Sequence, residues 1–353
     1  MKLVYFGSFA LAFTISFVAT FLVSRLAIRK KILDYPDTER KFHSQPTPYL
    51  GGVAIFTSFL LVTLTVGIFL GHLLGGNIPL RILTAIWAGG AILMIGGYLD
   101  DRYRLPAKYS IIFPVLAALT IVSSGISAVS IHNPFSGEII LLDDILWFGL
   151  PLASAIIVFG WTMVMTYTTK LLDGMDGLVT GLSAVAAMVL FGLSLTSQVQ
   201  QPQTALLAII FAGSLVGFLI LNFYPAKIFL GEGGSTFAGF MLAILAIVSG
   251  GKIATAVLVM GIPLLDAVWV VLQRLFNKQN PFSGDRKHLH FRLIDIGFSE
   301  PQAVIFLYVI AGMFGATTLF LQSLGKLIAL GALIVVMLII LIAVFVTYKL
   351  KKE

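Results

Sequence analysis

Apolar stretches long enough to cross a bilayer recur along the whole chain, and they constrain its fold more than any other feature. Each approaches the roughly 17–25 residues that a membrane-spanning helix needs. Only 11% of the residues are charged, against roughly 25% in soluble domains. The sequence therefore predicts one all-α, polytopic membrane domain over residues 1–353. We expect eleven spans, at about residues 3–25, 50–74, 82–99, 108–128, 145–167, 177–198, 203–223, 235–250, 253–276, 301–322 and 326–348.

Lysine and arginine residues gather on one side of this expected topology. With eleven spans, alternate loops share a side, and all but four of the 23 basic residues then lie together. Because basic loops stay in the cytoplasm, we expect the N-terminus outside and the C-terminus in the cytoplasm, in the cell (inner) membrane. The net charge of +7 then reflects topology, and we expect no nucleic-acid partner. The exceptions are Lys2, Arg81, Lys252 and Lys326.

Five carboxylates stand at the cytoplasmic ends of predicted spans, in the glycine-containing segments GGYLDD, LLDGMDGL and FLGEGGS. A single charge at a span end is usually a solvated boundary residue, but five in three such segments indicate a shared polar site. Oxygen-rich clusters suit Mg²⁺, which bridges carboxylates to substrate phosphates. We therefore expect Mg²⁺, with Mn²⁺ as an alternative. The five residues are Asp100, Asp101, Asp173, Asp176 and Glu232.

Two further cytoplasmic segments carry basic and histidine side chains. The first, DYPDTERKFHSQPTPYLGG at residues 34–52, is a basic loop that positive-inside charge alone could also explain. The second, NPFSGDRKHLHFRL at residues 280–293, contains His288, His290 and Arg292. A His-x-His pair without a third nitrogen or thiolate ligand is weak evidence for a transition metal. Beside a phosphate-handling site, these side chains better fit anion binding or proton transfer.

Asp266 differs from the other acids because it lies inside a predicted span, in GIPLLDAVWVV. Pro263 precedes it and can break the helix, and an acid within a membrane helix is by default a functional-site hypothesis. Two interpretations stay open. The break could open a lipid-facing groove toward the polar site, or Asp266 could bond a neighbouring helix or freed backbone groups.

Five segments, in this order, resemble the polyprenyl-phosphate N-acetylhexosamine-1-phosphate transferase family (glycosyl transferase family 4). The resemblance covers about residues 30–293 and is strongest to the WecA/TagO-like branch, which is related to MraY. The segments are DYPDTERKFHSQPTPYLGG, GYLDDRYRLPAK, LLDGMDGLVTG, LNFYPAKIFLGEGGS and PFSGDRKHLHFRL.

The resemblance implies a phosphotransferase that moves a sugar-1-phosphate from a UDP-N-acetylhexosamine to a polyprenyl phosphate such as undecaprenyl phosphate. The products are UMP and a polyprenyl-pyrophosphate-sugar, in the first membrane step of cell-envelope glycan synthesis, such as lipopolysaccharide or teichoic acid. UDP-GlcNAc is the expected donor, and the active site is expected to face the cytoplasm. The oligomeric state stays open, with a homodimer as one alternative.

The resemblance also assigns roles to individual residues. Glu232 is the expected metal ligand, together with Asp100 or Asp101, one of which is also the expected proton acceptor. The expected catalytic residues are Asp100, Asp101, Asp173, Asp176 and His288. The expected substrate-binding residues are Lys41, His43, Lys108, Lys170, Asn222, Lys227, His290 and Arg292.

The chain departs from the family pattern beside the expected metal site. The family usually has Asn where this chain has Tyr167 and Lys170, Asp where it has Glu232, and often a further His where it has Phe291. We expect Mg²⁺ to be kept, with Lys170 turned toward Asp173 or a pyrophosphate oxygen.

Two other functions stay open. A catalytically impaired family member could bind lipid without turnover. A membrane transporter would also explain many spans, although transporter sites lie near the bilayer midplane, whereas the carboxylates here gather at one face.

Overall fold

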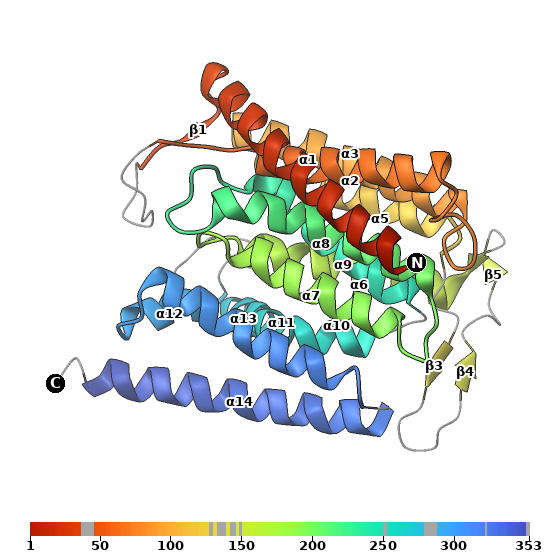
Figure 1. The fold of residues 1–353 in the computed structure, drawn as a ribbon. Coiled ribbons are helices and arrows are strands. Elements are labelled where there is room, and N and C mark those ends of the chain that lie inside the picture. Colours follow the sequence, from red (N-terminus) through yellow and green to blue (C-terminus); the bar gives the residue numbers. More distant parts are fainter. Residues whose placement is uncertain are drawn as a thin grey trace.

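The computed structural model is a bundle of helices, and it describes residues 1–36, 46–126, 130–132, 139–141, 146–147, 150–249, 253–278, 288–321 and 323–350 (Figure 1). Each of the eleven expected apolar stretches contains a helix. Within the described residues, eight helices are long and apolar enough to cross a membrane. They are α1 (Lys2–Arg29), α2 (Gly51–Leu64) with its π-helical extension η1 (Thr65–Phe69), α3 (Leu80–Tyr103), α6 (Leu152–Leu172), α8 (Pro202–Asn222), α9 (Gly231–Val248), α13 (Glu300–Thr317) and α14 (Ser323–Leu350).

In the other three expected spans, the helix is short or is divided into two. The fourth stretch is α4 (Ala107–Ser110) followed by α5 (Ile112–Ser123), and the sixth is α7 (Leu178–Ser194); both are short. The ninth is a pair, α10 (Ile253–Val259) and α11 (Gly261–Phe276), bent by 82° and counted as a ninth crossing if it is one span. The number of spans and the orientation of the termini stay predictions.

Short elements connect the helices. The strands form antiparallel pairs: β1 (Leu33–Asp34) with β2 (Thr47–Pro48), β3 (Ser130–His132) with β4 (Ile139–Leu141), and β5 (Leu146–Trp147) with β6 (Leu150–Pro151). A further helix, α12 (Leu289–Asp295), precedes α13. Figure 1 shows the start of α1 and the end of α14 at opposite ends of the bundle, with β1 and α12 at the end where α14 finishes.

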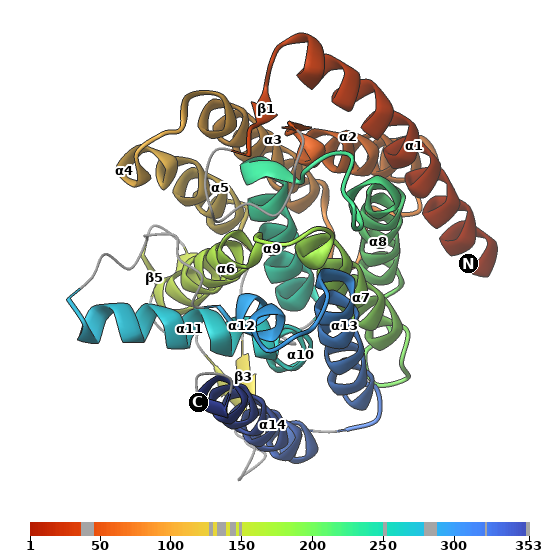
Figure 2. The ribbon, with the colours of Figure 1, turned by 90° about the vertical axis from the view of Figure 1, so that its left-hand side faces the viewer.

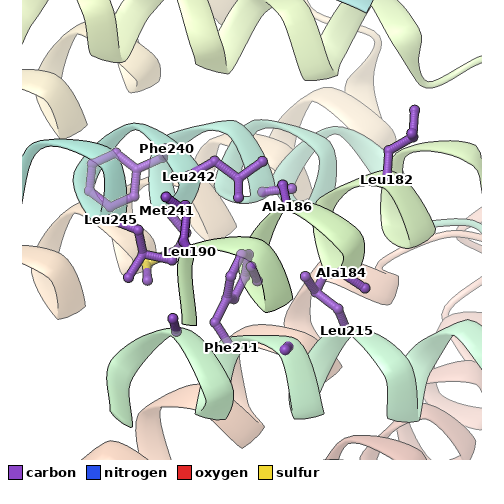
Figure 3. Packing of buried hydrophobic residues seen from close by; sticks show 14 of the residues in the cluster. Leu182, Ala184, Ala186, Leu190, Phe211, Leu215, Phe240, Met241, Leu242 and Leu245 are labelled. Carbon is purple, nitrogen blue, oxygen red and sulfur yellow. The ribbon is translucent and has the colours of Figure 1, made fainter. Parts of the chain in front are cut away.

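Helix α9 forms the centre of the bundle. All of its residues except Glu232 are buried, and α2, α3, α6 and α7 contact it (Figure 2). Phe240, Met241, Leu242 and Leu245 of α9 lie in the same apolar cluster as Phe211 of α8 (Figure 3). The first turn of this central helix carries the carboxylate of Glu232, which therefore lies at the end of the bundle.

Glycines set the close approach of helices around the first turn of α9. A Cβ on Gly97 of α3 would lie 2.1 Å from the backbone nitrogen of Gly233, and one on Gly52 of α2 would lie 2.3 Å from Gly234. Small residues let membrane helices approach closely. Since Gly97 is one turn before the acidic pair of α3, this contact brings the carboxylates of α3 beside Glu232.

The outer helices present apolar side chains to the surroundings. Leu3 and Phe6 of α1 are 85% and 73% exposed, and Ile328 of α14 is 67% exposed. Lipid can surround such side chains. Because an α-helix pairs its backbone N–H and C=O groups internally, it leaves none of them unpaired in the hydrocarbon region. These surfaces support a multi-pass membrane protein.

Candidate active site

Asp100 and Asp101 are adjacent in the sequence, yet their carboxylates have different partners. Asp100 accepts hydrogen bonds from the backbone N–H of Leu105 at 2.8 Å and from Oγ of Ser110 at 3.1 Å, so it orders the turn between α3 and α4. Asp101 accepts a hydrogen bond from the backbone N–H of Glu232 at 3.1 Å. It therefore faces the positive end of α9, where a carboxylate is stabilised.

Lys170, Glu232 and Ser110 link three helices at this site. The ammonium group of Lys170, at the end of α6, pairs with Oε1 of Glu232 and donates a hydrogen bond to Oγ of Ser110 at 3.1 Å. Ser110 in turn donates to Asp100. The expectation that Lys170 turns toward Asp173 or a pyrophosphate oxygen concerned the site with its metal bound, and it stays a prediction.

Two adjoining cavities open at this end of the bundle. The smaller, of about 360 Å³, is lined by acids and bases: Asp100, Asp101, Arg104, Lys170, Asp173 and Glu232. The larger, of about 600 Å³, has a mixed lining that includes Asp34, Asp173, Asp176, Asn222, Lys227, Phe229, Phe291 and Glu300. Tyr49, Asp173 and Gly231 line both, so they mark the boundary between the cavities.

Asp173 and Asp176 lie in the glycine-containing turn between α6 and α7. Asp173 is exposed to the water of the cavities, but the protein atoms around its carboxyl group, and the carboxylates of Glu232 and Asp176, raise its pKa to about 8. Each of these disfavours the negative form.

Both the side chain and the backbone of Asp176 are hydrogen-bonded. Its Oδ2 accepts from the backbone N–H of Ala226 at 2.8 Å, and its own N–H donates to Oε1 of Glu300 at 3.1 Å.

Asn222 and Lys227 lie on the segment that leads from α8 to α9. The buried side chain of Asn222 accepts a hydrogen bond from Oγ1 of Thr180 at 2.7 Å and donates to the carbonyl of Ile228 at 3.0 Å. Asn222 thus ties this segment to α7, and both Asn222 and Lys227 line the larger cavity.

The two histidines form a buried stack next to the site. His288 bonds Oδ2 of Asp266 through Nδ1 at 2.8 Å, while Oδ1 of Asp266 accepts the backbone N–H of Leu289 at 2.9 Å. The structure shows Asp266 bonded to a neighbouring segment, as the second interpretation expects, while the lipid-facing groove of the first interpretation stays a prediction. His290 stacks on His288, with ring centroids 5.6 Å apart. Burial, and then the neighbouring His288, lower the pKa of His290 to about 3, so its ring is neutral at pH 7.

The remaining expected residues are not brought to the cavities in the same way. Lys108 is exposed, and its ammonium lies 4.9 Å from the ring centroid of Tyr109. Arg292, like His288 and His290, is not among the residues that line the two cavities described here. Lys41 and His43 lie outside the described residues. The roles of all six stay predictions.

Several residues of the site were not predicted individually, among them Arg104 of the smaller cavity. Asp34 and Tyr49 line the larger cavity and belong to the basic loop that resembles the family, so the motif was a signal for them. Ser110 had no signal, because its importance lies in contacts with Asp100 and Lys170 from other segments. Glu300 stands in the first turn of α13, where acids are ordinary.

The residues of the smaller cavity fit a hard divalent cation by their chemistry. Its four carboxylates supply oxygen ligands, and the carboxylate of Glu232 already binds a positive charge, the ammonium of Lys170. A Cβ at Gly231 would lie 2.5 Å from Oδ2 of Asp101, so glycine leaves this oxygen accessible. Within the described residues, no three acid or imidazole groups already lie close enough together to bind one ion. Ligands from substrate, or a movement of Glu232, would complete the set.

The chain is similar to known proteins over most of its length. Residues 83–250 match glycosyl transferase family 4. A probable undecaprenyl-phosphate N-acetylglucosaminyl 1-phosphate transferase of Bacillus subtilis (strain 168) is 31% identical over 312 residues, which are 87% of this chain and 82% of the relative. A decaprenyl-phosphate N-acetylglucosaminephosphotransferase of Mycolicibacterium smegmatis is 30% identical, over 92% and 85% of the two chains. An undecaprenyl-phosphate alpha-N-acetylglucosaminyl 1-phosphate transferase of Thermotoga maritima is 30% identical, over 78% and 77%.

Proposed function

Because this chain belongs to glycosyl transferase family 4, we propose that it transfers N-acetylglucosamine-1-phosphate from a UDP-sugar to a polyprenyl phosphate. The printed names of the relatives from Bacillus, Mycolicibacterium and Thermotoga support both the transferred group and the polyprenyl acceptor. The products are a polyprenyl-pyrophosphate-sugar and UMP. The many apolar helices suit an enzyme whose acceptor is a membrane lipid.

The observation that carries this proposal is the pair of adjoining cavities that share Asp173. The larger cavity, of about 600 Å³, lies within the roughly 300–1,000 Å³ of small-ligand sites, and we assign it the nucleotide sugar. The smaller cavity contains Lys170 and Arg104, and we assign it the acceptor phosphate. Transfer then takes place at the boundary, where both substrates can meet.

The reaction brings two anions together. An oxygen of the lipid phosphate attacks the β-phosphorus of the donor, and the bond from that phosphorus to the oxygen of UMP breaks. Catalysis therefore depends on positioning and on neutralising phosphate charge. Lys170, Lys227 and Arg104 are the cations that line the cavities, and in the proposal they hold phosphate oxygens.

The acids have separate parts in this proposal. Asp101 or Asp100 accepts the proton of the incoming lipid phosphate, and the other organises the cation and substrate. Asp173 and Asp176 order the nucleotide side through the turn between α6 and α7 and its bond to Ala226. His288, held by Asp266, serves as a proton carrier, and His290 and Arg292 support the sugar-phosphate.

Mg²⁺, or Mn²⁺ in its place, belongs to the proposal as the cofactor. Glu232 and Asp100 or Asp101 would hold it, with the remaining ligands from water and substrate phosphates. When bound, it would supply positive charge to the transferring phosphoryl group. The site would face the cytoplasm, because the basic residues gather on that side of the expected topology.

The experiment is a transfer assay with purified protein, radiolabelled UDP-GlcNAc and undecaprenyl phosphate. Labelled lipid and free UMP are expected, and Asp173→Asn is expected to abolish both. Binding of the lipid without product would support the catalytically impaired alternative. Uptake of a solute into proteoliposomes, without any lipid product, would support the transporter.

A further inference from the structure

The ion pair between Lys170 and Glu232 lies on the wall of the smaller cavity rather than in the sealed core. The two side chains are 23% and 18% exposed, and they come from different helices, α6 and α9. A pair that water can reach can exchange partners without unfolding either helix. Glu232 is also the one residue of α9 that is not buried.

The pair holds the acid that the proposed function assigns to the metal. The ammonium of Lys170 lies on Oε1 of Glu232 and is held there by a second hydrogen bond, to Oγ of Ser110 at 3.1 Å. Ser110 is itself fixed by its bond to Asp100. The lysine is thus tethered at two points in the position from which it neutralises Glu232.

A divalent ion and this ammonium compete for the same carboxylate. Like charges a few ångströms apart repel strongly in a partly enclosed site, so the metal cannot bind Glu232 well while Lys170 stays there. The arrangement of the described residues agrees with this, since no three acid or imidazole groups are drawn together as ligands. Lys170 therefore acts as a competing cation at the metal site.

The donor supplies a way to remove this competitor. A diphosphate carries charged oxygens that accept strong hydrogen bonds from an ammonium group, and Lys170 lines the cavity that adjoins the larger one through Asp173. If the ammonium turns to the diphosphate, Glu232 becomes available to the metal. Donor and metal would then increase each other's affinity, since such coupling is reciprocal.

We propose that Lys170 blocks Glu232 against divalent metal ions in the substrate-free protein and releases it when a diphosphate-bearing donor binds. This inference rests on the proposed function for the identity of the donor. Its first half, competition between Lys170 and the metal, concerns the protein and the metal alone.

The test measures Mn²⁺ binding to the full-length protein in detergent, from the electron paramagnetic resonance signal of free Mn²⁺. Without nucleotide, Lys170→Met is expected to tighten Mn²⁺ binding by about tenfold to a hundredfold, because it removes a like charge a few ångströms from the ion. Addition of UDP-GlcNAc should tighten binding to the wild type but add little in Lys170→Met. Lys170→Gln is the second variant, in case the methionine impairs folding.

Two controls separate this effect from a general change in charge. Lys278→Met removes an exposed lysine at the end of α11 and should leave Mn²⁺ affinity unchanged. Glu232→Gln combined with Lys170→Met should lose the gain. Unchanged Mn²⁺ affinity in both Lys170 variants would overturn the proposal even if transfer activity is found. If Lys170→Met tightens Mn²⁺ but UDP-GlcNAc has no effect, the blocking is upheld and the donor-driven release is wrong.

Discussion

The carboxylate of Asp101 accepts a hydrogen bond from the backbone N–H of Glu232, at 3.1 Å, across the interface between α3 and α9. Asp101 therefore joins the end of one helix to the beginning of the central one. A carboxylate at this place stabilises the first turn of α9 and is also part of the wall of the smaller cavity. Its structural and proposed catalytic parts can be separated by substitution.

Asp101→Asn is expected to lower turnover by a factor of at least about 10² while the protein still folds. Asparagine keeps an oxygen that accepts the hydrogen bond of Glu232 but loses the charge. Asp101→Ala should lose about 1 kcal/mol of stability in addition, as capping residues do. Lipid-linked product and thermal unfolding in detergent are the two measurements. Near-normal turnover of Asp101→Asn would show that Asp101 has only a structural role.

Gly174→Ala is expected to reduce transfer more than fivefold by displacing the turn that carries Asp173 and Asp176, a change of about 1 kcal/mol in the barrier. A Cβ at position 174 would lie 2.8 Å from Nε2 of His290 and 2.9 Å from Cζ of Phe291. Gly160→Ala is the matched control, because nothing lies within 4 Å of its Cβ. Equal activity of the two variants would show that the turn adapts without cost.

Asp173 is expected to make stability depend on pH. Its pKa is about 8 in the folded protein, above the ordinary value of 3.8, so the folded state favours the protonated form. The contribution of this group to stability is fully present below about pH 4 and is lost as pH rises toward 8. Asp173→Asn has no such loss. The difference between its melting temperature and that of the wild type should therefore increase in favour of the variant as pH rises from 5.5 to 8.5.

The control for this pH effect is Asp295→Asn, which alters an exposed acid of α12. Its melting temperature should follow that of the wild type across the same range. A constant difference between Asp173→Asn and wild type at all pH values would contradict the raised pKa.

The topology can be tested with single cysteines, because the chain has none of its own. Ser197, between α7 and α8, and Lys278, after α11, are both exposed. The expected topology puts Ser197→Cys outside and Lys278→Cys in the cytoplasm. A membrane-impermeant maleimide applied to intact cells should then label only position 197. Labelling of both positions would contradict the eleven-span arrangement and the cytoplasmic site.

The sequence alone determined the class of fold and the set of acids at one end of the bundle. Hydrophobic stretches of membrane length allow little except helices, because lipid offers no hydrogen bonds to an open backbone. The segments around Asp100, Asp173 and Glu232 were recognised because charge is costly near a membrane and therefore stands out. Even so, short α7 and the 82° bend between α10 and α11 could not be predicted, since packing against neighbours decides where an apolar helix ends or turns.

The tertiary structure decided which of these side chains touch. Lys170 pairs with Glu232, while Asp100 and Asp101 point to different partners. Such contacts depend on how closely two helices approach, and here Gly97 and Gly233 set that distance between α3 and α9. Residue type and spacing determine which kinds of partner each side chain can bind. Only the packed helices fix which partner lies within the few ångströms over which an ion pair or hydrogen bond acts.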